Sequence, residues 1–550
     1  MTEKPVARHN AVGLLIDVVV LGATAVALFI ALTGGSTYSI AGHVVRLQTP
    51  GNPFVVIAFL LVVRYVWCAD ARFLLIGSAP RVAIDSLVRR LVVLLRAEAS
   101  TKGHQAIAAV WLVAALSLAL RLTNVVSHPG FLTGDDVEIH EMTFNALFGR
   151  HWPIWELRSP LYPMVFIYPV QRLLLATGET GTAALVAAAR AWVALMSSAM
   201  IWLVYAATMK VARGQVTALI AAALFAVSHL YLSLASSELP QPIAAIFVLA
   251  AFCLLLDRGA ARAAFAGALL GVGGSLRFGE FVFFVPAAAQ LAFERRRGEL
   301  VIVLASGALA AAVTLGVADW VYWGAPFFSL QHMLDFTLVQ QQSSRGFQPP
   351  WYYVLNTDYW TNPVFIAASL YSLTTSERRP ALWGWAAIAA LSALPHKESR
   401  YVIAALPFIC ISTALATRDI ALRRAVPRLT AVTILLLALA AGYEVSGWHA
   451  RRTDSAVAVA RQVADDHPRI VAAQQPWQFG GRLYWRDVAA LIDLTAFPSM
   501  PLQDVEVVVL SRAGTTRDEL ALYDQRGFSP TNKSTADYIV LSRRTRGSRS

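Results

Sequence analysis

Charged residues are scarce in this chain of 550 residues. Asp, Glu, Lys and Arg make up 15% of it, whereas 57% of the residues are hydrophobic and the mean hydropathy is +0.55. A soluble globular protein has roughly 25% charged and about 45–50% apolar residues, so the composition excludes an ordinary soluble enzyme. Apolar runs of about 20 residues, enough to cross a bilayer, recur between positions 12 and 445. They predict a polytopic membrane protein.

Cysteine is also rare, and no metal-binding pattern is present. Cys68, Cys253 and Cys410 each lie in or beside an apolar run, which argues against a disulfide framework or a cysteine metal site. The sequence has no HExxH motif, no Asp-x-Asp motif and no glycine-rich phosphate loop. We therefore expect no resident metal or cofactor, and the sequence leaves open whether a divalent metal assists.

Positive charge exceeds negative charge, with 46 Lys and Arg against 34 Asp and Glu and a net charge of +12. In a soluble chain this excess would favour nucleic-acid binding. Here the basic residues form short clusters between apolar runs, which is typical of the cytoplasmic turns of membrane proteins. We therefore expect a lipid bilayer and no nucleic acid as a partner. The many Arg and Ala residues are typical of a GC-rich bacterium and favour its plasma (inner) membrane.

Counting spans and checking the charge of each turn gives about 13 transmembrane helices. Residues 1–104 hold two extra N-terminal helices and a basic amphipathic segment (82–95) on the cytoplasmic surface. Residues 105–448 form the core, in which the proline-containing stretch 161–175 is expected to be interfacial or re-entrant. Residues 449–550 are polar and predict a small extracytoplasmic α/β domain with a disordered end. Its β-like runs are residues 469–473, 505–511 and 538–542. The predicted fold class is an all-α polytopic membrane protein with this domain attached.

The large outer loop, residues 123–160, carries four carboxylates within seven positions: Asp135, Asp136, Glu138 and Glu141. Beside lipid such a cluster is costly unless it lines a wet cavity, although a solvated acidic loop is the alternative. Adjacent Asp135 and Asp136 cannot share one helical face. One can therefore cap the following helix, while the other acts as general base for an acceptor hydroxyl.

A second charged cluster, residues 395–401, begins a span on the same outer face. His396, Lys397 and Arg400 place three potential cations within five positions, a pattern that suits a phosphate or pyrophosphate group. Topological anchors belong on the cytoplasmic side, so a functional role is favoured over anchoring. Arg277 is a further cation near this face.

Taken in order, these residues resemble the GT-C mannosyltransferases that use dolichyl-phosphate mannose and build GPI anchors and N-glycan precursors (glycosyltransferase family 22). The likeness covers residue 105 to the C-terminus. In the first loop it is carried by Asp135-Asp136, Glu141, Gly149, Trp155-Glu156, Arg158-Ser159 and Tyr162-Pro163. Further along it is carried by Ser236-Ser237-Glu238, Arg277, the segments 319–324 and 346–353, and His396-Lys397-Glu398 with Arg400-Tyr401.

The resemblance implies an integral-membrane inverting glycosyltransferase, with mannose as the first expectation for the sugar. It would transfer the sugar from a polyprenyl phosphate to a glycan, glycolipid or protein acceptor on the periplasmic face. Asp135 is the expected base and Asp136 the second choice. The donor phosphate would be bound by His396, Lys397, Arg400 and Arg277. The acceptor and sugar pocket would be shaped by Glu141, Trp155, Glu156, Arg158, Glu238, Trp351 and Tyr352.

Two other classes of function stay open. A transporter or flippase for a lipid-linked sugar would also have many spans, but transporters are often built from paired halves, and the sequence shows no clear internal repeat. Another GT-C enzyme, such as a protein O-mannosyltransferase or an aminoarabinose transferase, would share the Asp-bearing loop. Such an enzyme is not expected to share the block at 396–400.

Overall fold

The computed structural model describes most of the chain from residue 103 onward. The described residues are 13–26, 36–40, 43–47, single positions between 53 and 93, 103–340, 348–422, 427–446, 453–496, 498 and 502–544. Most of the second expected span (53–67), most of the amphipathic segment (82–95) and the end expected to be disordered (545–550) lie outside them. Before residue 103 an apolar helix covers Gly13–Val26, and β1 (Ser36–Ile40) pairs antiparallel with β2 (His43–Leu47).

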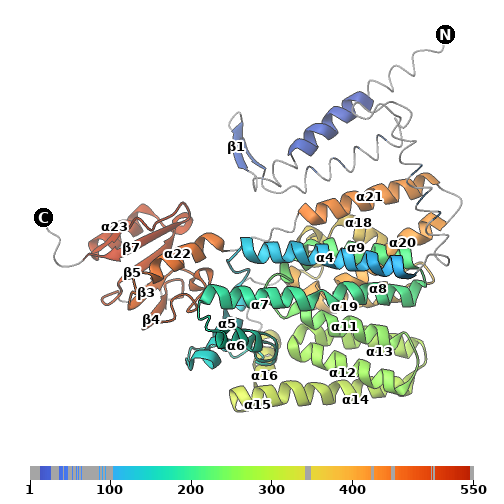
Figure 1. Cartoon of the computed structure of the whole chain (residues 1–550), viewed down its shortest axis with the longest axis horizontal. Helices are drawn as coiled ribbons and strands as arrows, with labels where there is room; N and C mark the ends of the chain where they lie inside the picture. The colour runs from blue at the N-terminus through green and yellow to red at the C-terminus, as the bar shows by residue number, and fades with distance from the viewer. Residues whose placement is uncertain are drawn as a thin grey trace, which may run out of the picture.

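A bundle of apolar helices makes up most of the molecule, with a small sheet domain at one end (Figure 1). Among the described residues, three continuous helical stretches are long and apolar enough to cross a membrane: Gln105–Ser127, Thr182–Ala212 and Arg297–Trp323. They contain α4 (Gly103–Ser127), then α7 (Thr182–Ser197) with α8 (Ala199–Ala212), and then α14 (Arg297–Ala311) with η3 (Ala312–Gly316) and α15 (Val317–Trp323). The expected total of about 13 spans stays a prediction.

Shorter helices fill the bundle between these stretches. They are α9 (Gln215–Val227), α10 (His229–Leu234), α11 (Gln241–Leu255), α12 (Ala260–Leu276), η2 (Phe278–Phe283), α13 (Phe284–Phe293), α17 (Tyr352–Leu355), η5 (Thr357–Tyr359), α18 (Pro363–Ser372), α19 (Arg379–Ser392), α20 (Leu406–Leu422) and α21 (Pro427–Ser446).

Glycines let α12 and α14 pack backbone to backbone. A Cβ on Gly267 would lie 2.3 Å from the Val303 carbonyl oxygen, and one on Gly271 would lie 2.3 Å from that of Gly307. Small residues four apart are a common means of close helix packing in membranes.

Short elements cover the end of the bundle that faces the sheet domain. They are α5 (Gly134–Phe148), η1 (Pro163–Ile167), α6 (Tyr168–Ala176), α16 (Phe328–Leu334), η4 (Asp335–Val339) and η6 (Ser399–Val402). The N-terminus of α5 has a capping box formed by Thr133 and Asp136, and the helix ends at Gly149, which has a φ of 60°. The stretch expected to be interfacial folds as η1 and α6 and contacts α5 and α7.

The C-terminal domain is the small α/β domain that the sequence predicts. Its sheet has the order β4-β3-β5-β7-β6, in which β3, β4 and β5 are parallel and β7 is antiparallel to both β5 and β6. Three strands match the predicted runs: β3 (Ile470–Ala473), β5 (Val507–Ser511) and β7 (Tyr538–Arg543). The other elements are α22 (Asp454–Ala464), η7 (Pro476–Phe479), β4 (Ala490–Asp493), η8 (Arg512–Gly514), α23 (Arg517–Gln525) and β6 (Phe528–Pro530).

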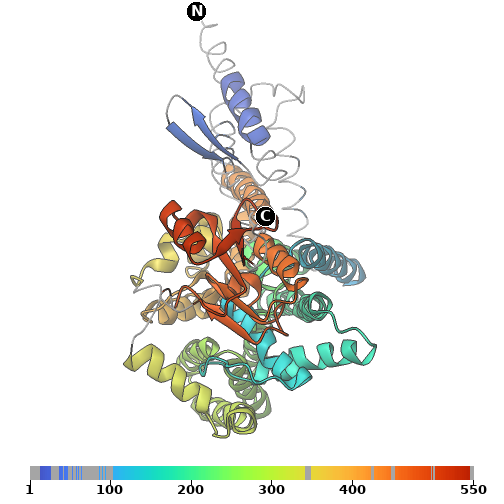
Figure 2. The ribbon, with the colours of Figure 1, turned by 90° about the vertical axis from the view of Figure 1, so that its left-hand side faces the viewer.

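This domain sits directly on the loop before α5, as the view from the domain side shows (Figure 2). Asp454 accepts hydrogen bonds from the Gly130 amide at 2.7 Å and contacts His128 Nδ1 at 2.8 Å. An apolar cluster joins the two parts through Phe131, Val137, Phe144, Leu185 and Val186 on one side and Val457 and Leu483 on the other. The domain therefore buries one face of α5.

Candidate active site

A cavity of about 510 Å³ opens at the end of the bundle that carries α5. Its wall combines the N-terminus of α5 with segments that are far apart in the sequence. These are residues 155–163, 239–241, 276–279, 333–338 and 391–401. The two charged segments singled out above, residues 123–160 and 395–401, therefore meet at one place.

Asp135 lies in this wall between two arginines. Its Oδ1 is 2.5 Å from Arg158 Nη2 and its Oδ2 is 2.6 Å from Arg400 Nη1. A carboxylate holds each arginine in turn, because Glu138 contacts Arg158 Nε and Glu398 contacts Arg400 Nε. A quarter of the Asp135 side chain remains exposed, so the carboxylate is accessible from the cavity.

The two arginines set the ionisation of Asp135. Burial alone would raise its pKa, but the two guanidinium groups together outweigh burial and lower the pKa to about 2. The pKa of Glu138 moves the other way, because burial outweighs its single partner Arg158. Asp135 is therefore ionised at neutral pH.

Asp136 has a different role from its neighbour. Its Oδ2 accepts hydrogen bonds from the amides of Leu132 at 2.7 Å and Thr133 at 3.4 Å, and the side chain is fully buried. It is not among the described residues that line the cavity. One aspartate thus caps α5 while the other faces the open space, and this arrangement favours Asp135 over Asp136 as the base.

Three of the four expected phosphate-binding residues line the cavity: Arg277, His396 and Arg400. Arg277 pairs with Glu280 at 2.6 Å and its guanidinium lies 4.8 Å from the centre of the Tyr401 ring. Lys397 is placed differently from the expectation. Its Nζ donates to the carbonyl oxygens of Gln348, at 2.8 Å, and Leu394, and the residue is buried. Lys397 therefore binds the backbone of a neighbouring chain segment, at Gln348, and does not face the cavity.

The residues expected in the sugar pocket divide into two groups. Trp155 and Arg158 line the cavity. Glu156 is largely exposed and lies 3.1 Å from His332 Nε2, and Trp351 is 58% exposed. Together with Tyr352, these two are absent from the cavity wall within the part of the chain that the structure describes.

Glu141 and Glu238 lie outside the cavity wall, contrary to the expected placement. Because helix positions advance by about 100° per residue, Glu141 points about 120° away from Asp135, toward the C-terminal domain. There it accepts a hydrogen bond from the Arg482 amide at 3.0 Å, and burial raises its pKa to about 7. Glu238 is fully buried between Arg190, at 2.7 Å, and His140 Nε2, at 3.1 Å, where it ties α5 to α7.

A sequence model of the Alg9-like mannosyltransferase family matches residues 136–463. This chain belongs to that family. No curated protein matches the chain with significant sequence similarity. Among solved structures, ArnT from Cupriavidus metallidurans bound to undecaprenyl phosphate is similar, with a TM-score of 0.53 and 13% identity over 79% of this chain and 97% of ArnT. The apo state of the same ArnT gives a TM-score of 0.51 and 14% identity over the same shares.

The fold of this Alg9-like protein is thus that of the GT-C enzymes, and the chain is an integral membrane glycosyltransferase. Both the family and the superfamily resemblance were predicted from the residues of the outer loop and of the block at 396–401. The detailed placement of those residues comes from the geometry described above.

Several residues of the site in this family member had no predicted role. Glu138 and Glu398 orient the two arginines, and Tyr401 lies beneath Arg277 and Arg400. Arg190 supports α5 through Glu238 and also donates to the carbonyl oxygens of His128 and Pro129. A signal for Arg190 existed, because a lone arginine inside an apolar span needs a buried partner.

Proposed function

We propose that this enzyme transfers a sugar, most simply mannose, from a polyprenyl-phosphate donor to an acceptor hydroxyl on the extracytoplasmic face of the plasma membrane, with inversion at the anomeric carbon. The observation that carries the proposal is the ionised Asp135 carboxylate in the wall of a 510 Å³ cavity, held between Arg158 and Arg400. Membership of a mannosyltransferase family supports mannose.

The cavity has two kinds of wall, which suit the two parts of such a donor. Arg277 and Arg400 offer positive charge to a phosphate, and His396 offers a ring N–H. Apolar side chains from α16 and η4 suit an isoprenoid chain, and they are Met333, Leu334, Phe336 and Leu338. The similar ArnT was solved with undecaprenyl phosphate bound, which supports a polyprenyl phosphate as the lipid.

The reaction is a single displacement. Asp135 accepts the proton of the acceptor hydroxyl, and the oxygen attacks the anomeric carbon of the donor sugar. The bond from this carbon to the phosphate oxygen breaks, and polyprenyl phosphate leaves with one more negative charge. Arg400, Arg277 and His396 stabilise that charge as it develops. Arg158 keeps Asp135 oriented throughout.

Donor binding also changes the strength of the base. With both arginines in contact, the pKa of Asp135 is about 2, so the carboxylate is a weak base. A donor phosphate competes with Asp135 for Arg400, and when Arg400 moves to the phosphate one cause of the lowered pKa is removed. Asp135 then has a higher pKa and accepts a proton more readily, so that the base becomes active only with donor in place.

Sugar transfer in isolated membranes tests the proposal. Membranes that contain the wild type, Asp135→Asn or Asp504→Asn are supplied with radiolabelled polyprenyl-phosphate mannose, and label is followed into glycolipid, polymer and protein fractions. Asp504 is an exposed aspartate of the C-terminal domain and is the matched control. We expect transfer by the wild type and the control, and a loss of about 10²–10⁴-fold in Asp135→Asn.

Two outcomes would contradict the proposal. Full activity of Asp135→Asn would remove Asp135 from the role of base. If no label reaches an acceptor while intact lipid-linked sugar crosses the membrane only with the wild type, the transporter alternative takes the place of the transferase.

A further inference from the structure

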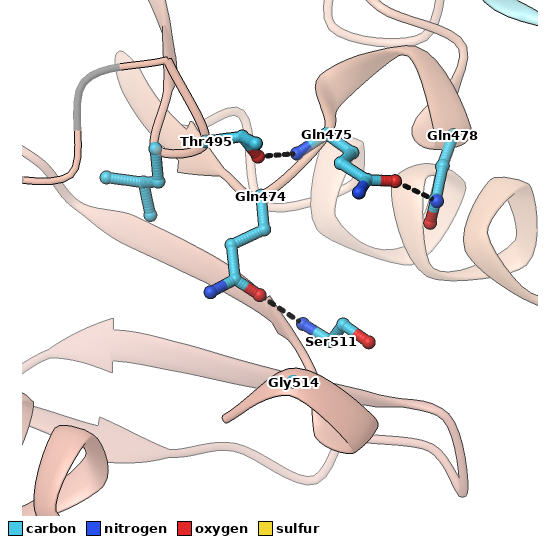
Figure 3. Close-up of a pocket in the computed structure, with 7 residues that line it drawn as sticks. Gln474, Gln475, Gln478, Thr495, Ser511 and Gly514 are labelled. Atoms are coloured by element: carbon cyan, nitrogen blue, oxygen red, sulfur yellow. Dashed lines mark hydrogen bonds between the residues drawn. The ribbon is translucent and has the colours of Figure 1, made fainter. Parts of the chain in front are cut away.

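A second cavity lies in the C-terminal domain, apart from the one that holds Asp135. It has a volume of about 330 Å³ and is lined by Gln474, Gln475, Gln478, Leu494, Thr495, Ser511 and Gly514 (Figure 3). Gln474 directly follows β3, Leu494 directly follows β4, and Ser511 is the last residue of β5. These three strands are parallel. Open α/β sheets bind their ligands outside the carboxyl ends of such strands.

Hydrogen bonds within the protein engage all three glutamine amides. Gln474 Oε1 accepts from the Ser511 amide at 2.9 Å, Gln475 Oε1 accepts from Gln478 Nε2, and Gln478 Oε1 accepts from the Tyr538 hydroxyl at 3.0 Å. Each carbonyl oxygen is thus already used within the protein. The amide nitrogens of Gln474 and Gln475 remain as donors in the cavity wall, as Figure 3 shows.

The backbone at Gln475 brings two neighbouring side chains to one cavity. Gln475 has φ +50° and ψ +65°, in the left-handed region. Residues with a Cβ are uncommon in this region, and strained backbone of this kind concentrates at functional sites. Successive side chains of a continuing strand would point to opposite faces, whereas the turn after β3 lets Gln474 and Gln475 line the same space.

Within the part of the chain that the structure describes, the donors that line this cavity carry no formal charge. All seven lining residues are neutral, whereas phosphates and carboxylates are characteristically bound by Arg or Lys. Oriented amides and hydroxyls match the hydroxyl and ring oxygens of a sugar. We propose that the cavity binds a neutral carbohydrate unit and, if the proposed transferase function holds, that this unit is a part of the acceptor glycan distant from the reacting hydroxyl.

One short helix connects this cavity to the catalytic loop. η7 carries Gln478 in the cavity wall and also Trp477. A Cβ on Gly134 would lie 3.7 Å from Cβ and Cγ of Trp477, and Gly134 directly precedes Asp135. A glycan bound at the second cavity is therefore held by an element that contacts the catalytic loop. Binding energy from a remote part of a substrate can position its reacting group.

Binding of free oligosaccharides to the full-length protein in nanodiscs tests the proposal, with saturation-transfer NMR as the readout. The probes are mannotriose and maltotriose, and trigalacturonic acid is the anionic comparison. The test variants are Gln474→Ala and Gln475→Gly. Glycine tolerates the left-handed backbone, so Gln475→Gly removes an amide without straining the fold. Gln525→Ala, at an exposed glutamine that ends α23, is the matched control.

We expect at least one neutral trisaccharide to bind the wild type, and each test variant to bind it about tenfold more weakly because a neutral hydrogen bond is lost. Gln525→Ala should bind like the wild type. The proposal is overturned if neither neutral sugar binds, if trigalacturonic acid binds more tightly than both, or if the two test variants bind like the wild type.

Asp135→Asn distinguishes this proposal from the transferase proposal. Its cavity in the C-terminal domain is unaltered, so it should bind the trisaccharide like the wild type while losing transfer. Loss of binding in Asp135→Asn would place the sugar in the core cavity. It would overturn the inference about the second cavity and leave the transferase proposal standing. Full transfer by Asp135→Asn, together with weakened binding in the glutamine variants, would overturn the base assignment and leave the carbohydrate site standing.

Discussion

Asp135 and Arg400 allow the proposed activation of the base to be tested at the scale of single residues. In Arg400→Gln one of the two cations that lower the pKa of Asp135 is gone, so this pKa rises in the free enzyme. The acid limb of kcat/KM, which reports the free enzyme, should move to higher pH. The acid limb of kcat reports the donor complex, in which Arg400 has already moved to the phosphate, and should shift less.

The measurement is label transfer as a function of pH for the wild type, Arg400→Gln and Arg517→Gln, an exposed arginine of α23 that serves as the control. In the wild type, the acid limb of kcat should lie at higher pH than that of kcat/KM. Equal shifts of both limbs in Arg400→Gln would mean that Arg400 stays on Asp135 when donor binds.

Glu141 gives a second prediction at this scale, which concerns stability. Burial raises its pKa from an ordinary value of 4.5 to about 7, so the folded protein binds the proton more tightly than the unfolded chain. Folding stability is therefore lost as pH rises from about 4.5 to about 7, by on the order of 3 kcal/mol at most. In Glu141→Gln this loss should disappear, because the amide oxygen can still accept from Arg482 without carrying charge.

Melting temperatures of the detergent-solubilised protein at pH 5 and pH 8 measure this effect. The decrease between the two pH values should be smaller in Glu141→Gln than in the wild type. Glu179→Gln, at an exposed glutamate in the turn before α7, should decrease like the wild type. An unchanged decrease in Glu141→Gln would show that this carboxyl does not carry the pH dependence.

At the scale of elements, the contact between the loop before α5 and the C-terminal domain depends on Gly130. A Cβ at this position would lie 2.4 Å from both Asp454 N and Thr453 C, which are backbone atoms. Gly130→Ala therefore has to push the domain away from α5, at a cost of about 1–3 kcal/mol. We expect a lower melting temperature, faster proteolytic cleavage between α21 and α22, and weaker sugar transfer.

Gly298→Ala is the matched control for this contact, because nothing lies within 4 Å of a Cβ at Gly298 and the residue is in the first turn of α14. Limited proteolysis with mass spectrometry locates the cleavage. Cleavage of Gly130→Ala at the rate seen for Gly298→Ala would mean that the close approach at Gly130 does not determine how the domain docks.

Elements also show where sequence reasoning succeeded and where it stopped. Strands β3, β5 and β7 were predicted because each contains an apolar run, and these runs are mostly buried. By contrast, β4 has no fully buried residue and ends in Asp493, and β6 has only three residues. Asp135 and Arg400 were predicted to share a site through a resemblance. Periodicity could not reveal that Glu141, on the same helix as Asp135, would face a domain more than 300 residues away in sequence.

At the scale of the whole molecule, the distribution of charge predicts the orientation in the membrane. Arg158 accepts a hydrogen bond from Trp323 at its carbonyl, so α15 ends beside the catalytic cavity, and α14 begins at the opposite end of the bundle. That opposite end carries Arg295, Arg296 and Arg297, together with Lys210 and Arg262 at neighbouring turns. Short basic turns mark the cytoplasmic side, so we expect the cavity that contains Asp135 and the C-terminal domain to lie outside.

Thiol labelling tests this orientation in intact cells. In a background in which Cys68, Cys253 and Cys410 are replaced by alanine, single cysteines are introduced as Gln525→Cys and Gly298→Cys. A membrane-impermeant maleimide should label Gln525→Cys at once, because α23 belongs to the domain that we expect outside, and should label Gly298→Cys only after the membrane is permeabilised. The reverse pattern would place the cavity in the cytoplasm, where the basic turns at the other end of the bundle would have to be translocated against the charge rule.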